Sequence, residues 1–131
     1  MGGYRDLKVY ERSYAAARAI YKMTEMFPKE EMYGMTNQMR RASISIPMNI
    51  SEGYAKKESQ TEFKRFLMMA IGSANEMSVL IDFSKDFEYI EKDVHAKAAA
   101  EYEEICKMLN TLIQKVGGKE AVNVTTKEDK E

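Results

Sequence analysis

The sequence predicts an all-α fold, an antiparallel up-down-up-down four-helix bundle. The 131 residues include only two prolines, runs of β-branched residues are short, and apolar residues recur at spacings of three and four rather than two. The pattern divides into four segments that would form helices about 30 to 40 Å long. Short connections between such helices favour antiparallel packing around one core. We expect one bundle domain over residues 1–118 and a flexible charged tail over residues 119–131.

The first predicted helix runs from about Arg5 to Phe27. It ends there because Pro28 disfavours helical backbone in the residue that precedes it. The residues expected to face the core are Leu7, Tyr10, Tyr14, Ala17 and Tyr21.

The second predicted helix begins near Thr36, a candidate N-cap, and ends at about Lys57. Its expected core stripe is Met35, Met39, Ala42, Ile46, Asn49 and Gly53. Pro47 lies inside this helix, where it removes a donor and clashes with the carbonyl of Ser43, at a cost of about 3 kcal/mol unless compensated. The hydroxyls of Ser43, Ser45 and Ser51 are expected to bind the freed carbonyls. Pro47 then either bends the helix around the bundle, with Gly53 allowing close backbone approach, or forms a hinge or binding notch.

The third predicted helix has the clearest start. Ser59 and Glu62 fit a capping box, in which the serine hydroxyl accepts from the Glu62 amide while the glutamate side chain reaches back. Its expected core stripe is Phe63, Leu67, Ala70, Ala74, Met77 and Ile81. A fourth helix is predicted from about Glu91 to Val116, before Gly117 and Gly118, with Ala98, Tyr102, Ile105, Leu109, Leu112 and Val116 facing the core.

The second and third helices each carry a further set of apolar residues that points away from the predicted core. At 100° per residue, Met68, Gly72, Val79 and Phe83 fall opposite the Phe63 stripe, and Ile44 and Met48 point away from Met39. Either one face is a wide core stripe, or these residues form a contact between copies of the chain. The second interpretation predicts an oligomer interface made of Ile44, Met48, Met68, Gly72, Glu76, Val79 and Phe83.

Charge is distributed unevenly, although the formal net charge is only -1. Residues 36–66 contain six basic and three acidic side chains, whereas residues 82–104 contain eight acidic side chains and three lysines. Repeated around a ring, the first segment could form a basic belt that contacts phosphates. Alternatively it is a solvated face, with Arg41 paired to Glu52 or Glu76 of a neighbouring copy. The candidate nucleic-acid-binding residues are Arg40, Arg41, Lys56, Lys57, Lys64 and Arg65.

The sequence offers little for catalysis. A di-iron bundle needs Glu-x-x-His pairs, and the only histidine, His95, follows Lys92 by three positions and Glu91 by four. The only cysteine, Cys106, lies eleven residues further along the same helix, about three turns away, so it is expected to be a packing residue. No phosphate-binding glycine loop occurs. We therefore predict no enzymatic activity, no cofactor and no metal.

The cellular setting follows from two observations. A single cysteine suits a reducing compartment. Neither a long uninterrupted apolar segment nor the apolar core of a signal peptide is evident. The sequence therefore predicts a cytoplasmic protein that does not enter a membrane.

Several motifs occur together in the second and third helices: the pair Arg40-Arg41, the run SIPMNISEG over residues 45–53, the pair Lys56-Lys57, and GSANE over residues 72–76. This joint pattern closely resembles the four-helix bundle protein family encoded by intervening sequences in bacterial 23S rRNA genes, and YRDLKVYERS resembles the start of that family more loosely. The resemblance implies a left-handed up-down bundle, assembly into a homopentamer, and no known catalytic activity.

A related branch comprises the accessory variability proteins of diversity-generating retroelements. Those proteins are similar pentameric barrels that bind nucleic acid and a reverse transcriptase, and they look strongly basic, whereas this chain is near neutral. The resemblance predicts a non-catalytic homo-oligomer associated with RNA or DNA as an accessory protein. The alternative is a protein-interaction scaffold, for example for a reverse transcriptase, without affinity for nucleic acid.

Overall fold

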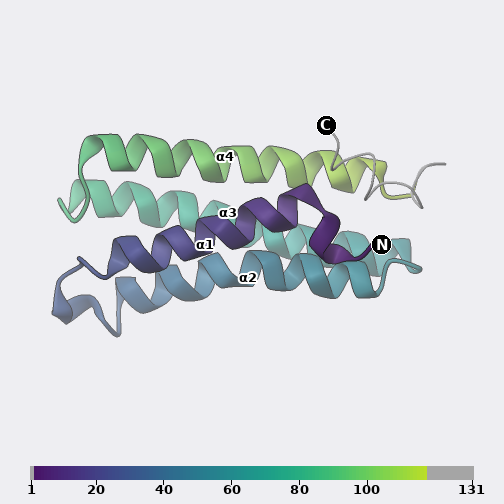
Figure 1. Cartoon of the computed structure of the whole chain (residues 1–131), viewed down its shortest axis with the longest axis horizontal. Helices are drawn as coiled ribbons and strands as arrows, with labels where there is room; N and C mark the ends of the chain where they lie inside the picture. Colours follow the sequence, from purple (N-terminus) through teal and green to yellow (C-terminus); the bar gives the residue numbers. More distant parts are fainter. Residues whose placement is uncertain (1, 118–131) are drawn as a thin grey trace.

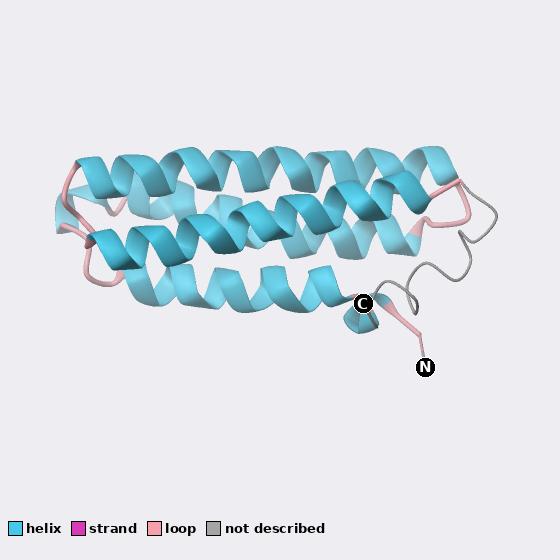
Figure 2. Ribbon diagram, turned by 90° about the horizontal axis from the view of Figure 1, so that it is seen from above, coloured by secondary structure: helices cyan, strands magenta, loops and turns pink. Residues whose placement is uncertain are grey.

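The described part of the chain, residues 2–117 of a computed structural model, is a four-helix bundle. Its helices are α1 (Lys8–Thr24), α2 (Met35–Ala55), α3 (Gln60–Asp86) and α4 (Lys92–Lys115), with short 3₁₀ turns at Tyr4–Asp6 and Lys29–Glu31. Each helix packs against the next in sequence, and the contact between α1 and α4 is the loosest of the four (Figures 1 and 2). The predicted all-α antiparallel bundle is confirmed, and its left-handed sense stays a prediction. Gly118 and the predicted tail at residues 119–131 lie outside the described residues.

The core stripes predicted for α3 and α4 are confirmed. All six residues predicted for α3 are buried. So are Tyr102, Ile105, Leu109 and Leu112 of α4 and Val116 directly after it, while Ala98 is partly buried. Among the described helices, α3 alone has the length and composition of a membrane span. Its buried stripe packs between α2 and α4, which is typical of the core helix of a soluble bundle.

The predicted start and core face of the first helix are wrong in part. The chain forms a 3₁₀ turn at Tyr4–Asp6, Leu7 is extended, and α1 begins at Lys8. The residues of α1 that enter the core are Val9, Ser13, Ala16, Ala17, Ile20 and Thr24. Tyr14 and Tyr21 are exposed instead, because small residues let α1 approach the core closely while large rings fit better along its edge.

The junction between α1 and α2 also differs from the prediction. Helix α1 ends at Thr24, before the buried Phe27, whose ring centroid lies 5.1 Å from that of Tyr89. Thr36 is not an N-cap, since it is buried inside α2, which begins at Met35. The Glu31 side chain supplies the cap, and its Oε1 accepts from the Met35 amide at 2.9 Å.

Helix α2 continues through Pro47, and Gly53 permits a close approach to α3. A Cβ atom at residue 53 would lie 2.9 Å from the Cβ of Phe66 and 3.2 Å from Cδ1 of Phe63, so the prediction for Gly53 is confirmed. The prediction for the serines is not confirmed. Ser43 donates to the carbonyl of Arg40 at 2.9 Å, and Ser45 bonds to Ser73.

The start of α3 and the end of α4 agree with the predictions in part. Ser59 Oγ accepts from the Glu62 amide at 3.2 Å, as predicted, but the Glu62 carboxylate binds Arg65 rather than reaching back. Helix α4 ends at Lys115, and Gly117 has a φ of 100°, a left-handed conformation that favours glycine.

Candidate assembly and binding surfaces

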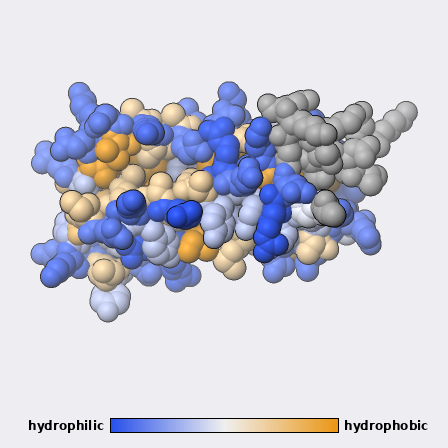
Figure 3. All heavy atoms as spheres, in the orientation of Figure 1, coloured by the Kyte–Doolittle hydropathy of each residue, from blue (hydrophilic) through white to orange (hydrophobic). Residues whose placement is uncertain are grey.

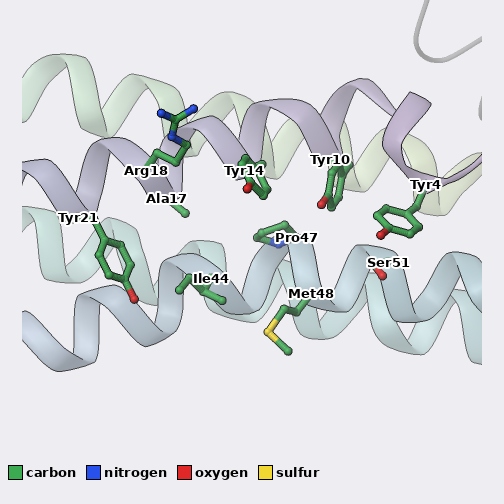
Figure 4. A pocket seen from close by; sticks show the side chains of 10 residues that line it. All are labelled: Tyr4, Tyr10, Tyr14, Ala17, Arg18, Tyr21, Ile44, Pro47, Met48 and Ser51. Atoms are coloured by element: carbon green, nitrogen blue, oxygen red, sulfur yellow. The ribbon is translucent and has the colours of Figure 1, made fainter.

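A groove lined by tyrosines runs between α1 and α2. Figure 4 shows Tyr10, Tyr14 and Tyr21 in a row along α1, with Tyr4 beyond its start and Pro47 facing them from α2. The groove has a volume of about 560 Å³, and we call it the tyrosine groove. Its lining residues are Tyr4, Tyr10, Tyr14, Ala17, Arg18, Tyr21, Ile44, Pro47, Met48 and Ser51.

The rings of the tyrosine groove pack against one another. The ring centroids of Tyr4 and Tyr10 lie 4.9 Å apart at an edge-on angle, and those of Tyr10 and Tyr14 lie 5.9 Å apart. Partial burial raises the pKa of Tyr10 above its ordinary value. Tyr14 remains 52% exposed, so its ring is available to another surface. Aromatic faces beside hydroxyl groups suit contact with side chains that are part apolar and part polar.

A second apolar surface follows the outer side of α3. We call Met68, Gly72, Val79 and Phe83 the α3 strip, and all four residues are exposed, as predicted. Phe83 continues it toward Phe87, with ring centroids 5.5 Å apart. A groove of about 510 Å³ borders its C-terminal part, lined by Met35, Gln38, Glu76, Val79, Leu80, Phe83 and Phe87.

The predicted interface residues therefore lie on two surfaces rather than one. Ile44 and Met48 line the tyrosine groove, while Glu76, Val79 and Phe83 line the groove beside the α3 strip. The sequence pattern placed the tyrosines of α1 in the core, so it did not identify them as residues of an exposed groove. Val9, Ala16 and Ile20 form a second apolar stripe with helical spacing in the same helix. Because that stripe could fill the core, it indicated that the tyrosines lie outside it.

A third, polar groove separates α2 from α3 and has a volume of about 460 Å³. Arg41 and Glu76 both line it, and the Glu76 carboxylate accepts from the neutral Gln38 side chain at 3.3 Å. Arg41 has no carboxylate partner among residues 2–117. Its charge is therefore available to a partner outside the described residues.

An apolar groove of about 430 Å³ lies between α1 and α4, where the helix contact is loosest. Ala16, Ile20 and Met23 line it from α1, and Val94 and Ala98 from α4. Figure 3 shows a hydrophobic patch over the N-terminal part of α4 on this side of the molecule. Arg12 spans the two helices and binds Glu101 with two nitrogens, at 3.0 and 2.8 Å.

The six predicted nucleic-acid-binding residues fall into two groups. Arg40 and Arg41 lie near the start of α2, and the others lie around the turn between α2 and α3, about 22 Å further along at 1.5 Å per residue. Lys64 and Arg65 diverge around α3, since neighbouring helical residues point about 100° apart.

Several of these basic side chains make contacts within the chain. Arg40 Nε donates to Thr24 Oγ1 at 2.9 Å, and its guanidinium lies 4.7 Å from the Tyr21 ring centroid, so it joins α1 to α2. Arg65 binds Glu62 at 3.0 Å. Lys56 Nζ lies 3.9 Å from Glu52 Oε1, and Lys57 Nζ donates to the Tyr54 hydroxyl at 2.9 Å.

The only histidine and the only cysteine of the sequence, His95 and Cys106, have different hydrogen-bond partners and do not form a shared site. His95 bonds to Asp82 at 2.8 Å, and Cys106 contacts Asn75 at 3.4 Å. Burial raises the pKa of the Cys106 thiol, which lowers its reactivity. Within residues 2–117 no group of three or more histidine, cysteine or acidic side chains could hold a metal ion.

Together these features define a small four-helix bundle with open apolar grooves on several sides. The chain matches the family described as 23S rRNA-intervening sequence protein over residues 5–111. It belongs to that family, which the motif around Pro47 had indicated.

A solved structure supports the same assignment. The chain is similar to a protein of unknown function from the S23 ribosomal protein family of Bacteroides thetaiotaomicron VPI-5482, with 25% identity and a TM-score of 0.73. The match covers 81% of this chain and 95% of that protein. No curated protein matches the chain.

Proposed function

We propose that this protein is a non-catalytic, homo-oligomeric bundle that acts in the cytoplasm as an accessory protein. The observation that carries the proposal is the exposure of large apolar side chains on two sides of the bundle. Met48 is 60%, Met68 62% and Val79 53% exposed. Exposed apolar surface of this extent is typical of an interaction site rather than of a free monomer. Self-association is the simplest way to cover it.

The family resemblance favours five copies. Light scattering after size-exclusion chromatography tests this directly, since a protomer of 15.1 kDa gives a pentamer about five times as heavy. A closed assembly of any other size corrects the number. A monomer at micromolar concentration refutes the proposal.

A second candidate function is binding of RNA or DNA by the assembled ring. It is favoured by Arg41, Lys57 and Lys64, which have no carboxylate partner among the described residues. Repeated in every copy, Arg41 would form one band of charge, and Lys57 and Lys64 would form a second band about 22 Å away, each able to contact phosphates. Arg40 is left out of this set because its contacts hold α1 and α2 together.

Titration into labelled structured RNA and DNA at several salt concentrations tests the second candidate. Replacing Arg41, Lys57 and Lys64 by Gln should weaken binding and reduce the slope of log affinity against log salt, by about 0.7 to 0.9 per lost contact. The matched control replaces Lys92, Lys97 and Lys107 of α4, which are exposed and remove the same charge.

Equal loss in both triple variants would indicate a nonspecific charge effect and would refute a belt at these positions. An intact assembly without affinity for nucleic acid would leave the protein-interaction scaffold, with a protein such as a reverse transcriptase as its partner.

A further inference from the structure

We infer that the copies join head to tail, with the α3 strip of one copy packed into the tyrosine groove of the next. The inference rests on the proposed self-association and identifies the two faces that meet. The groove is hollow and aromatic, whereas the α3 strip is an outer helix face of methionine, valine, phenylalanine and glycine. Surfaces so unlike each other are better suited to a heterologous contact than to self-pairing across a twofold axis. Heterologous contacts form closed rings when the rotation closes.

The two faces lie at the same level along the bundle. Arg40 bonds to Thr24, and Gln38 bonds to Glu76, so Tyr21 and Val79 both lie near the first turns of α2. Further along α2, Ser45 bonds to Ser73, and Met48 lines the groove together with Tyr14. In a ring whose axis is parallel to the helices, every copy keeps the same level. Val79 would therefore meet the Tyr21 end of the groove, and Met68 and Gly72 its middle.

The charges beside the two faces are complementary. Arg18 lines the tyrosine groove and has no carboxylate partner among the described residues. Glu76 lies beside the α3 strip, and within residues 2–117 its hydrogen-bond partner is the neutral Gln38 alone. In the head-to-tail contact Glu76 approaches Arg18 of the neighbouring copy. Such pairs at the rim of an interface set its register and orientation.

Gly72 gives the α3 strip a notch. Apart from the backbone of α3 itself and the residues next to Gly72, no atom of the described residues lies within 4 Å of the position that a Cβ would occupy there, so glycine is not required by packing inside the protomer. A missing side chain between Met68 and Val79 leaves room for a ring from the neighbouring copy. Tyr14, which is half exposed at the same level, is the ring that fits this place.

Two single variants and their mixture test the inference. Tyr14→Arg places a charge in the tyrosine groove, and Val79→Arg places one on the α3 strip. Both side chains are about half exposed in the protomer, so each variant should keep its fold, which a thermal melt checks. Each variant alone should be monomeric. A one-to-one mixture should form dimers and nothing larger, because each variant keeps the face that the other has lost.

Met26→Arg, at a loop residue that is 83% exposed and lies outside both faces, is the matched control and should assemble like the unaltered protein. If the unaltered protein assembles but the mixture stays monomeric, or if either variant still forms rings, the head-to-tail pairing is refuted. If the unaltered protein is itself a monomer, the proposed self-association fails first.

Discussion

At Gly53 the backbone of α2 lies directly against the Phe66 side chain of α3. A Cβ at residue 53 would lie 2.9 Å from the Cβ of Phe66, which is shorter than atoms of this kind approach. Gly53→Ala should therefore push the helices apart and cost about 1 to 2 kcal/mol of unfolding free energy, even after the better helix propensity of alanine is counted. Urea denaturation at pH 7 measures this loss.

Gly3→Ala is the matched control, because nothing lies within 4 Å of the position of its added methyl and its extended backbone suits any residue. There alanine should leave stability unchanged or raise it by up to about 1 kcal/mol. Equal effects of the two substitutions would contradict the close contact at Gly53.

The ion pair between Arg12 and Glu101 joins α1 to α4, the two neighbouring helices with the loosest contact. The pair is bidentate but its side chains are 40% and 33% exposed, so solvent screens it. A double-mutant cycle with Arg12→Ala and Glu101→Ala should give a coupling of about 0.5 to 1 kcal/mol that shrinks as salt is added. Arg12→Lys should recover only part of it, since lysine lacks the planar fork. Full recovery by lysine would show that the second hydrogen bond contributes nothing.

Glu31 connects two loops through its charged form. Its carboxylate accepts from the Met35 amide at 2.9 Å and from the Tyr89 hydroxyl at 2.7 Å, and these bonds hold its pKa below the ordinary value of 4.5. A lowered pKa in the folded state adds stability above pH 4.5, which is lost as the pH falls through the folded-state pKa. Between pH 6 and pH 3 the Tm of the unaltered protein should therefore fall further than that of Glu31→Gln.

Glu58→Gln, at an exposed glutamate in the turn before α3, is the control for this pH series. Its Tm should follow the unaltered protein across the range. The role of Glu31 would be contradicted if both variants had the same pH dependence.

Tyr102 carries a buried hydroxyl without a hydrogen-bond partner among the described residues. Burial also raises the pKa of this phenol, so it stays neutral. Tyr102→Phe removes an unpaired polar atom at little change of shape and should leave stability unchanged or raise it by about 1 kcal/mol. Tyr54→Phe, which removes the acceptor for Lys57, should instead give a small loss. A clear loss at Tyr102 in urea denaturation would mean that its hydroxyl is hydrogen-bonded in solution.

The bundle and the core of its last two helices could be predicted because their patterns are unambiguous. In α3 one stripe from Phe63 to Ile81 carries the core, and Ser59 marks its start. In α1 two stripes of similar spacing compete, and the choice between tyrosines and small residues depends on how closely α1 approaches its neighbours. Periodicity contains no information on that distance.

The sequence also could not show which basic residues are free to bind a partner. Arg40 and Arg41 are adjacent and chemically identical, yet Arg40 joins two helices through Thr24 and Tyr21 while Arg41 stays exposed. The difference arises from the position of α1 beside α2, which no local motif specifies. Charge counts along the chain therefore located a basic segment correctly but could not identify which of its members are free to bind.

The loose seam between α1 and α4 also bears on how the protein is made. All the extensive contacts join helices that follow one another in the chain, so each can form with little loop closure. As the chain leaves the ribosome, α1 and α2 can pair before α3 has emerged, and α3 can add to them before α4 is complete. The contact between α1 and α4 on the Arg12–Glu101 side has to wait for the last helix, as does the contact between α3 and α4. We therefore expect folding during synthesis to proceed one hairpin at a time and to end with the contact between α1 and α4.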